Sequence, residues 1–248
     1  MAADAEARAR AFDFDGPTTH HRLTDSTNDR ARELAVAGAV SGTVVVADEQ
    51  TAGRGRTGRT WSAPAAAALL CSAILRPLEA HHALLPLAVP IAVCEAAESL
   101  APVECQIKWP NDVWLGERKL AGVLIEARPP EWAVIGVGLN LSIPDDAFPD
   151  DLRWPAMSLG HGVDAAQALV ALRETLKRWT AAEPGDVARA FAKRDALRGR
   201  EVAWEGAGGS DTNGSGKADG IDDRGNLLVV TGSGERVSLG AGEVSLRL

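Results

Sequence analysis

Apolar and polar positions along the chain recur with two different periods, one typical of helices and one typical of strands. Residues 27–37 have a helical pattern behind the capping-box sequence S-x-x-D at Ser26 and Asp29. This predicts a helix that ends just before a glycine. The β-branched run at 43–47 predicts a short buried strand that leads into a glycine-rich loop.

The next apolar segments are less uniform in character. Residues 65–75 leave helix and strand open, because alanine favours a helix while the flanking prolines bound a length that also fits a strand. Residues 83–100 predict an apolar helix, in which Pro86 and Pro90 require an early position or a kink.

A series of short strand-like runs follows between residues 104 and 141, separated by turn signals. Adjacent short strands of this kind predict a sheet. Two further helices are expected, one capped by Asp164 and one that opens at Asp186 and ends near Gly199.

The character of the chain changes near residue 198. Short strands with glycine and aspartate turns predict a small C-terminal β-barrel, so that residues 1–197 form a larger domain and 198–248 a smaller one. The Gly/Ser-rich segment 206–216 has low complexity, and we expect it to be a mobile hairpin extension.

Composition and charge restrict the class of protein. The 248 residues are 46% hydrophobic and 24% charged, as in a soluble globular protein, and we find no apolar run of the ~18 residues that a membrane span needs. The N-terminus lacks the apolar core of a secretory signal, which predicts a cytoplasmic protein. A net charge of −8 argues against a general nucleic-acid binder.

Cysteines and histidines form no recognisable metal or redox motif. Cys71, Cys94 and Cys105 are odd in number and far apart, so we expect small core residues and neither a disulfide framework nor a zinc ribbon. The histidine pairs at 20–21 and 81–82 have no companion ligands, and we expect them on the surface.

The sequence GRGRTGRTW at residues 53–61 fits the dinucleotide fingerprint G-x-G-x-x-G, but no helix signal follows it, which disfavours a Rossmann dehydrogenase. Arg54, Arg56 and Arg59 supply fixed positive charge instead, which predicts a flexible loop that wraps an anion and orders on binding. A solvated basic turn is the alternative. Trp61 suits either an aromatic wall against a purine or a loop anchor.

Two lysines and an acidic turn stand near the predicted strands. Lys108 ends one strand, and the Asn111–Asp112 pair either stabilises a turn or lets Asp112 help to hold Mg²⁺. Lys119 begins a buried strand, where an ammonium group is costly unless it pairs with an anion.

Three glycines interrupt the same strand-like runs. Gly122 permits close approach of a ligand or backbone, and Gly136 and Gly138 remove side chains along one face of a strand. This leaves room for a flat ligand, or for tight sheet packing. Because no nucleophile motif is present, positioning and charge stabilisation are the expected catalytic strategy.

Six ordered blocks closely resemble the biotin protein ligase family: DSTN (25–28), EQTAGRGRTGRTW (49–61), KWPNDVWL (108–115), KLAGVLIE (119–126), GVGLNL (136–141) and GEVSLR (242–247). The resemblance implies an α+β fold, with helices packed on a mixed-sheet catalytic domain and a C-terminal SH3-like β-barrel. It also implies that biotin and MgATP form biotinyl-5′-adenylate and pyrophosphate, after which a lysine of a biotin carboxyl carrier protein attacks the adenylate.

The resemblance also assigns roles to residues. It implies a biotin site of Ser26, Thr27, Gln50, Gly53, Arg54, Lys119, Gly122, Gly136 and Gly138. It implies a nucleotide site of Arg56, Arg59, Trp61, Lys108, Asn111, Asn140 and Arg247. Lys119, Arg56 and Asp112 would carry the chemistry, with Asp112 near the metal, and Lys119 is the residue on which catalysis most depends.

Other functions remain as alternatives. A lipoate or octanoate ligase or transferase shares the same core, and a non-catalytic biotin sensor would use the same pocket. Only 25 residues precede Ser26, so we expect no DNA-binding repressor domain and a ligase activity alone. The expected partner is the carrier domain of a biotin-dependent carboxylase, with no nucleic acid or membrane, and the sequence is compatible with a monomer or a homodimer.

Overall fold

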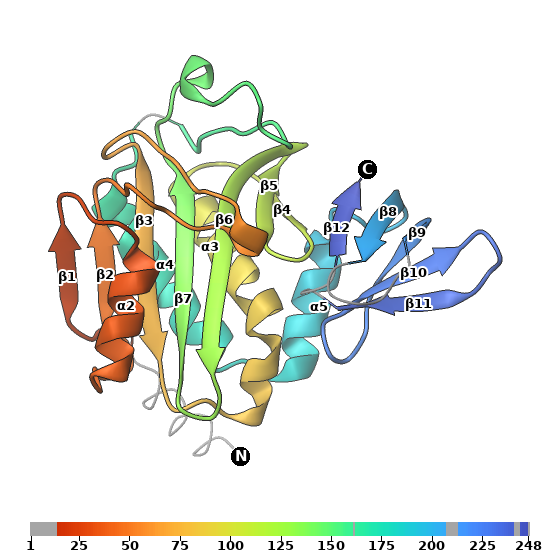
Figure 1. The fold of residues 1–248 in the computed structure, drawn as a ribbon, viewed down its shortest axis with the longest axis horizontal. Helices are drawn as coiled ribbons and strands as arrows, with labels where there is room; N and C mark the ends of the chain where they lie inside the picture. Colours follow the sequence, from red (N-terminus) through yellow and green to blue (C-terminus); the bar gives the residue numbers. More distant parts are fainter. Residues whose placement is uncertain (1–13, 161, 207–212, 241–243, 248) are drawn as a thin grey trace.

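The computed structural model describes residues 14–160, 162–206, 213–240 and 244–247. Most of the Gly/Ser-rich segment, the single glycine of the last sequence block and the side chain of Arg247 lie outside the described parts. The described chain forms a mixed seven-stranded sheet with helices on both faces and a second, five-stranded sheet, which confirms the predicted α+β class (Figure 1).

The large sheet has the strand order β1-β2-β3-β7-β6-β5-β4. Only β1 and β2 pair in parallel, and every other neighbouring pair is antiparallel. Its strands are β1 (Thr18–His21), β2 (Val44–Ala47), β3 (Ala68–Leu75), β4 (Cys105–Lys108), β5 (Asp112–Leu115), β6 (Arg118–Arg128) and β7 (Trp132–Asn140).

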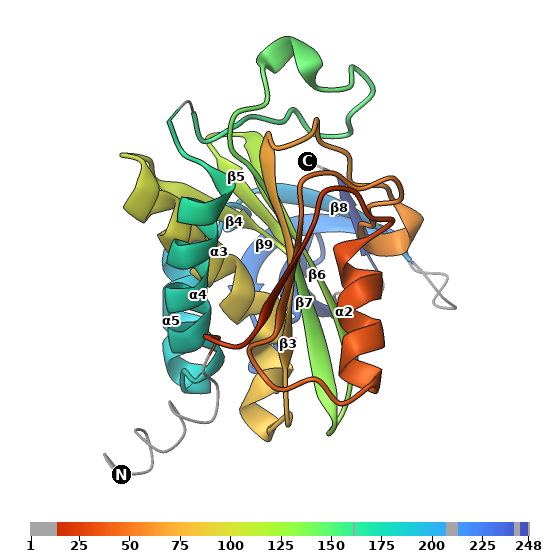
Figure 2. The ribbon, with the colours of Figure 1, turned by 90° about the vertical axis from the view of Figure 1, so that its left-hand side faces the viewer.

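Helices cover the two faces of this sheet unequally. Of the α-helices in the described residues, α2 lies on one face and the three longer ones lie on the other (Figure 2). The helices are α2 (Thr27–Val36), α3 (Leu85–Leu100), α4 (Ala165–Thr180) and α5 (Pro184–Arg194), with 3-10 turns η1 (Arg56–Gly58), η2 (Ala80–Leu84) and η3 (Asp145–Ala147). Because α2 is only ten residues long, part of its face of the sheet is left open to other segments.

The ambiguous segment 65–75 contains β3, an interior strand of the large sheet. All eight residues of β3 are buried, because one face packs under α2 and against the cluster around Ile143, while the other joins the main apolar core. A strand buried on both faces loses the alternation of polar and apolar residues that identifies a half-exposed strand. The local pattern therefore could not separate it from a helix.

Two helix starts differ from the sequence prediction. Helix α2 begins at Thr27 as predicted and ends at Val36, one residue before the predicted end, but the Ser26 side chain makes no capping hydrogen bond, so the predicted capping box is wrong. Helix α5 begins at Pro184, before Asp186, and ends at Arg194, before the predicted end near Gly199. Asp164 caps α4 as expected, since its carboxylate accepts from the Gln167 N–H.

The C-terminal sheet has the order β11-β10-β9-β8-β12, and all its pairs are antiparallel. Its strands are β8 (Glu201–Gly206), β9 (Gly214–Ile221), β10 (Leu227–Thr231), β11 (Arg236–Leu239) and β12 (Val244–Arg247). The Trp109 indole N–H donates to the Gly225 carbonyl at 3.0 Å, and a Cβ at Gly225 would lie 3.2 Å from Leu87 and 3.4 Å from Leu84. The small sheet is therefore fastened to the large one close to the KWPND motif.

Residues 80–100, which comprise η2 and α3, are long and apolar enough to cross a membrane by length and composition. The expectation that no such run exists was therefore wrong. Of the apolar window, 67% is buried inside the protein, where α3 packs on the sheet and on α4. Such burial is typical of the core helix of a globular protein.

The cysteine prediction is confirmed, since all three thiols are free and buried. The histidine prediction is only half right. His82 is buried, and its ring accepts from the Glu79 N–H in a capping interaction at the start of η2. Burial and the neighbouring His81 lower the pKa of His82 to about 4, so its ring is neutral at physiological pH.

Candidate functional site

The uncovered face of the sheet carries a row of residues with very small side chains. Gly138 on β7 pairs with Gly122 on β6, and Gly122 pairs with Asp112 on β5. Two neighbouring strands therefore present bare backbone on the same face, with a carboxylate at the end of the row. This confirms that the glycines clear one face of the strands.

Gly136 has a different neighbour from Gly138. A Cβ atom at Gly136 would lie 2.0 Å from Asn28 Oδ1, so this glycine lets α2 approach the sheet. The Asn28 amide is held there, because its Oδ1 accepts from the buried Ser72 hydroxyl at 2.6 Å and its Nδ2 donates to Glu126 at 3.0 Å. Tight packing, one of the two interpretations of the glycines, therefore applies at Gly136.

The DSTN sequence forms the turn into α2 at one side of the cavity. The Asp25 carboxylate accepts from Arg30 and from the Ser26 N–H, and these bonds hold the pKa of Asp25 well below its usual range. Gln50 Oε1 accepts from the Thr27 N–H at 2.7 Å and from the Thr27 hydroxyl at 3.1 Å. Gln50 thus does the capping that the sequence assigned to Ser26.

The glycine–arginine loop, residues 53–61, closes on itself by backbone hydrogen bonds. The Trp61 N–H donates to Gly53 at 2.9 Å, and the Gly55 N–H donates to Arg59 at 2.6 Å. A Cβ at Gly53 would lie 2.4 Å from the Trp61 carbonyl, so only glycine fits at the base of the loop. Burial lowers the pKa of Arg56.

Trp61 lies directly over the glycine row. A Cβ at Gly138 would come within 2.4 Å of the indole, and one at Gly122 within 2.9 Å. The indole nitrogen is buried and has no hydrogen-bond partner among the described residues, and the Lys119 ammonium lies 5.4 Å from the ring centroid. The loop therefore places an aromatic ring against the bare sheet, beside a cation.

Lys119 and Asp112 form an ion pair at one end of this row. Lys119 Nζ lies 2.7 Å from Asp112 Oδ1, and the two side chains are 26% and 9% exposed. The Asp112 carboxylate offsets the cost of placing the Lys119 ammonium at the start of a buried strand. Asn111 donates to the Val123 carbonyl at 2.8 Å, which supports the turn interpretation for that residue.

Lys108 is more deeply buried than Lys119. Its ammonium lies 5.1 Å from the Trp154 ring centroid and 5.8 Å from that of Trp114. Burial lowers the pKa of Lys108 to about 8, although the nearby Asp112 carboxylate opposes this effect. The positive charge in this corner is therefore sensitive to mildly alkaline pH.

These elements enclose a cavity of about 630 Å³, within the size range of small-molecule sites. The structure brings fourteen of the predicted site residues to its wall: Ser26, Thr27, Gln50, Arg54, Arg56, Arg59, Trp61, Asn111, Asp112, Lys119, Gly122, Gly136, Gly138 and Asn140. Gly53 and Lys108 do not line the cavity. Arg247 lies on β12, with its side chain outside the described parts.

Sequence reasoning missed one side of the cavity. Phe148, Leu152, Arg153 and Trp154 line it from the irregular segment between β7 and α4. Asn140 fastens this segment, because its amide donates to the Met157 carbonyl at 3.0 Å. The available signal was the cluster of large apolar side chains in a segment too irregular to be a core element.

A metal site is only partly formed by protein groups. Among the described residues, no three histidine, cysteine or carboxylate side chains are grouped so as to hold a metal ion. Mg²⁺ at phosphate sites usually takes one or two carboxylates and completes its shell with phosphate and water oxygens. Asp112 is compatible with that arrangement, provided that it exchanges Lys119 for the metal.

Comparisons with known proteins agree with the resemblance. Residues 21–140 match the biotin/lipoate A/B protein ligase family, and residues 199–247 match the biotin protein ligase C-terminal domain. The chain is 36% identical over 235 residues to a biotin--[acetyl-CoA-carboxylase] ligase of Mycobacterium tuberculosis, covering 89% of this chain and 85% of the relative.

A second relative is the bifunctional ligase/repressor BirA of Bacillus subtilis, at 39% identity over 158 residues. That match covers 59% of this chain and spans only about half of the relative, 48%. Among solved structures, the biotin protein ligase of Aquifex aeolicus in complex with biotin and ATP superimposes with a TM-score of 0.79 at 29% identity, covering 93% of this chain and 98% of that chain.

Alanine at the two β7 glycines should have unequal effects. Gly136→Ala forces a Cβ into the hydrogen-bonded Asn28 amide and should lower the free energy of unfolding by about 1–3 kcal/mol. Gly138→Ala meets the ring of a loop side chain that can move, and should cost less. Urea unfolding of both variants measures the difference, and equal losses would contradict the two different roles.

Lys108→Met should stabilise the protein near neutral pH. The folded-state pKa of Lys108 is lowered from 10.5 to about 8, so below pH 8 the folded state bears the full cost of the buried charge, on the order of 3 kcal/mol. Between about pH 8 and 10.5 the unfolded chain binds more protons, so the wild type gains stability and the difference shrinks. Urea unfolding of both proteins at several pH values measures this, and a difference in the free energy of unfolding that does not change between about pH 7 and 10 would contradict it.

Proposed function

Because the chain belongs to the biotin protein ligase family, we propose that it activates biotin with ATP to biotinyl-5′-adenylate and then transfers biotin to a lysine of a carrier protein. The observation that carries this proposal is the Lys119–Asp112 pair beside the opposed glycines, with the arginine loop above them. The cavity thus combines a flat floor of bare backbone with concentrated positive charge.

Lys119 would act on the first step. The biotin carboxylate attacks the α-phosphorus of ATP, a bond to phosphorus forms, and pyrophosphate leaves with the electrons of the broken P–O bond. Two anions must approach each other, and an ammonium between them offsets their repulsion and the charge that develops on the phosphorus oxygens. Lys119 is suited to this role, because it lies at the end of the glycine row.

The biotin end of the cavity would be the DSTN side. Ser26, Thr27 and Gln50 place hydroxyl and amide groups at the cavity wall, where they can hydrogen-bond a neutral ureido ring. The bare backbone of Gly122 and Gly138 would receive the flat bicyclic ring once Trp61 moves. Gly53 would act indirectly, through the shape of the loop.

The nucleotide end would be the arginine side. Arg56 and Arg59 would bind phosphate oxygens, and Trp61 and Asn140 would lie near the base. Asp112 would help to hold Mg²⁺, which supplies charge neutralisation at the phosphates when bound. Lys108 does not line the cavity, so it would act on the phosphates only through the electrostatic field of its positive charge. Arg247, on the small C-terminal sheet, would be a further nucleotide-binding residue.

The second step would join the acyl group to a carrier. An amine of the acceptor lysine attacks the carbonyl carbon of the mixed anhydride, the C–O bond breaks and AMP leaves. A carrier domain of a biotin-dependent carboxylase fits this chemistry, and three free buried thiols are compatible with the cytoplasm as the site of action. Lipoate or octanoate transfer is the alternative within the wider biotin/lipoate A/B protein ligase family that residues 21–140 match.

Exchange of labelled pyrophosphate into ATP tests the activation step directly. Biotin should support exchange, and Lys119→Gln, which keeps a hydrogen-bond donor for Asp112 but removes the charge, should slow it by about 10²–10³. Lys193→Ala, at an exposed lysine on α5, is the matched control and should exchange at the wild-type rate.

One result would overturn the substrate assignment, and another would overturn the role of Lys119. Exchange that depends on lipoate and not on biotin would transfer the chain to the alternative activity. Full exchange by Lys119→Gln would remove Lys119 from the catalytic role while leaving the substrate assignment in place.

A further inference from the structure

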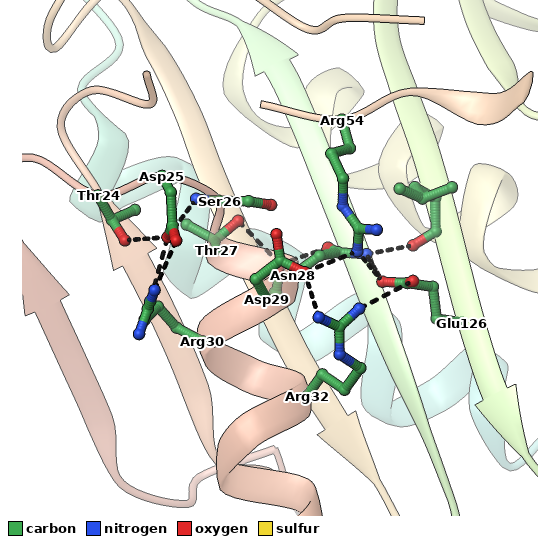
Figure 3. Close-up of polar contacts among 12 residues, drawn as sticks. Thr24, Asp25, Ser26, Thr27, Asn28, Asp29, Arg30, Arg32, Arg54 and Glu126 are labelled. Carbon is green, nitrogen blue, oxygen red and sulfur yellow. Dashed lines mark hydrogen bonds and ion pairs between the residues drawn. The ribbon is translucent and has the colours of Figure 1, made fainter. Parts of the chain in front are cut away.

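Arg54, at the base of the glycine–arginine loop, is bound by two carboxylates, one on the large sheet and one on helix α2 (Figure 3). Its Nη2 atom lies 2.6 Å from Glu126 Oε2 and 3.1 Å from Asp29 Oδ1. Glu126 belongs to strand β6 and Asp29 to the first turn of α2. The loop is therefore tied by one side chain to a strand and to a helix at once.

A second arginine contacts the same two carboxylates. Arg32 on α2 lies 2.7 Å from Asp29 Oδ1 and 3.6 Å from Glu126 Oε1. With Arg54 in place, two positive charges face two negative ones. When the loop opens and Arg54 moves away, Arg32 still contacts both carboxylates. The two acids therefore keep one positively charged partner.

The cluster continues to the cavity wall through Asn28. Glu126 Oε2 accepts from Asn28 Nδ2 at 3.0 Å, and Asn28 Oδ1 accepts from the buried Ser72 hydroxyl. Asn28 itself lines the cavity. Glu126 is thus held in place from the protein interior while its outer side binds the loop arginine.

We propose that Glu126 and Asp29 are positioning residues that hold the glycine–arginine loop closed over the cavity through Arg54. The side chains of Arg54, Glu126 and Asp29 are 37%, 27% and 22% exposed, so each ion pair is weakened by solvent and biases the loop without locking it. Its consequence for catalysis rests on the proposed function: a closed loop shields the acyl adenylate from water.

Hydrogen exchange of the ligand-free protein tests the latch without any assumption about substrates. The amides of Gly55, Arg59 and Trp61 donate to carbonyls within the loop and report on its closed form. Glu126→Gln keeps the shape and the bond to Asn28 but removes the charge, and should speed their exchange by about three- to tenfold. Glu131→Gln is the matched control, since Glu131 pairs with Arg128 in the turn between β6 and β7.

A double-mutant cycle shows whether Glu126 acts through Arg54. Arg54→Met should also speed loop exchange, and adding Glu126→Gln to it should cause less than a twofold further change. Added salt, from about 0.05 to 0.5 M, should speed exchange in the wild type more than in Glu126→Gln. Additive effects, or unchanged exchange in Glu126→Gln, would overturn the proposal and leave Glu126 with a structural role only.

Catalysis supplies a separate readout. With biotin and ATP but no acceptor protein, hydrolysis of the adenylate releases AMP, and Glu126→Gln should release it several-fold faster than the wild type. Its pyrophosphate exchange at saturating substrates should stay within about twofold of the wild-type rate. If no adenylate forms at all, the proposed function fails, and the exchange data still decide the latch. If adenylate forms and loop exchange is unaffected, the latch alone fails.

Discussion

The close opposition of Gly122 and Gly138 on neighbouring antiparallel strands is the constraint on which the rest of the site depends. A side chain at either position would collide with the Trp61 ring. Because both residues lack a Cβ, the sheet keeps a flat strip of backbone on a face that α2 is too short to cover. The cavity lies over Gly122 and Gly138, on the part of this face that α2 does not cover.

Charge is arranged around this strip in two balanced groups. Lys119 and Asp112 form a pair at one end, and Arg54 with Arg32 faces Asp29 and Glu126 at the other side. In the first group an acid holds the lysine that the proposed reaction needs near an anion, and in the second two acids hold the arginine that ties down the loop. Before substrates bind, the acids reduce the repulsion between the cations. Their ion pairs also fix the position of each basic side chain.

The sequence was most informative where a motif has one physical explanation. The order of strands between 104 and 141, the helix after Ser26 and the glycine-cleared face all follow from periodicity and from residues without side chains. Fourteen predicted residues meet at one cavity wall because the first five of the six blocks come together on the same face of the large sheet. Their individual roles toward a ligand remain predictions.

What the sequence could not supply depends on contacts between distant segments. Gln50 caps α2 from 23 positions away, and this contact displaced the local capping box that Ser26 and Asp29 suggest. Strand β3 is buried on both faces only because of elements before and after it. The Arg54–Glu126 pair spans 72 positions, and no local pattern marks either residue as a partner of the other.

A crystal structure of the protein with biotin and a non-hydrolysable ATP analogue tests the central claim most directly. The account predicts the bicyclic ring of biotin on the backbone of Gly122 and Gly138, Trp61 displaced from that strip, and the biotin carboxylate within hydrogen-bonding distance of Lys119 Nζ. Biotin bound elsewhere, with Trp61 still seated on the two glycines, would contradict it.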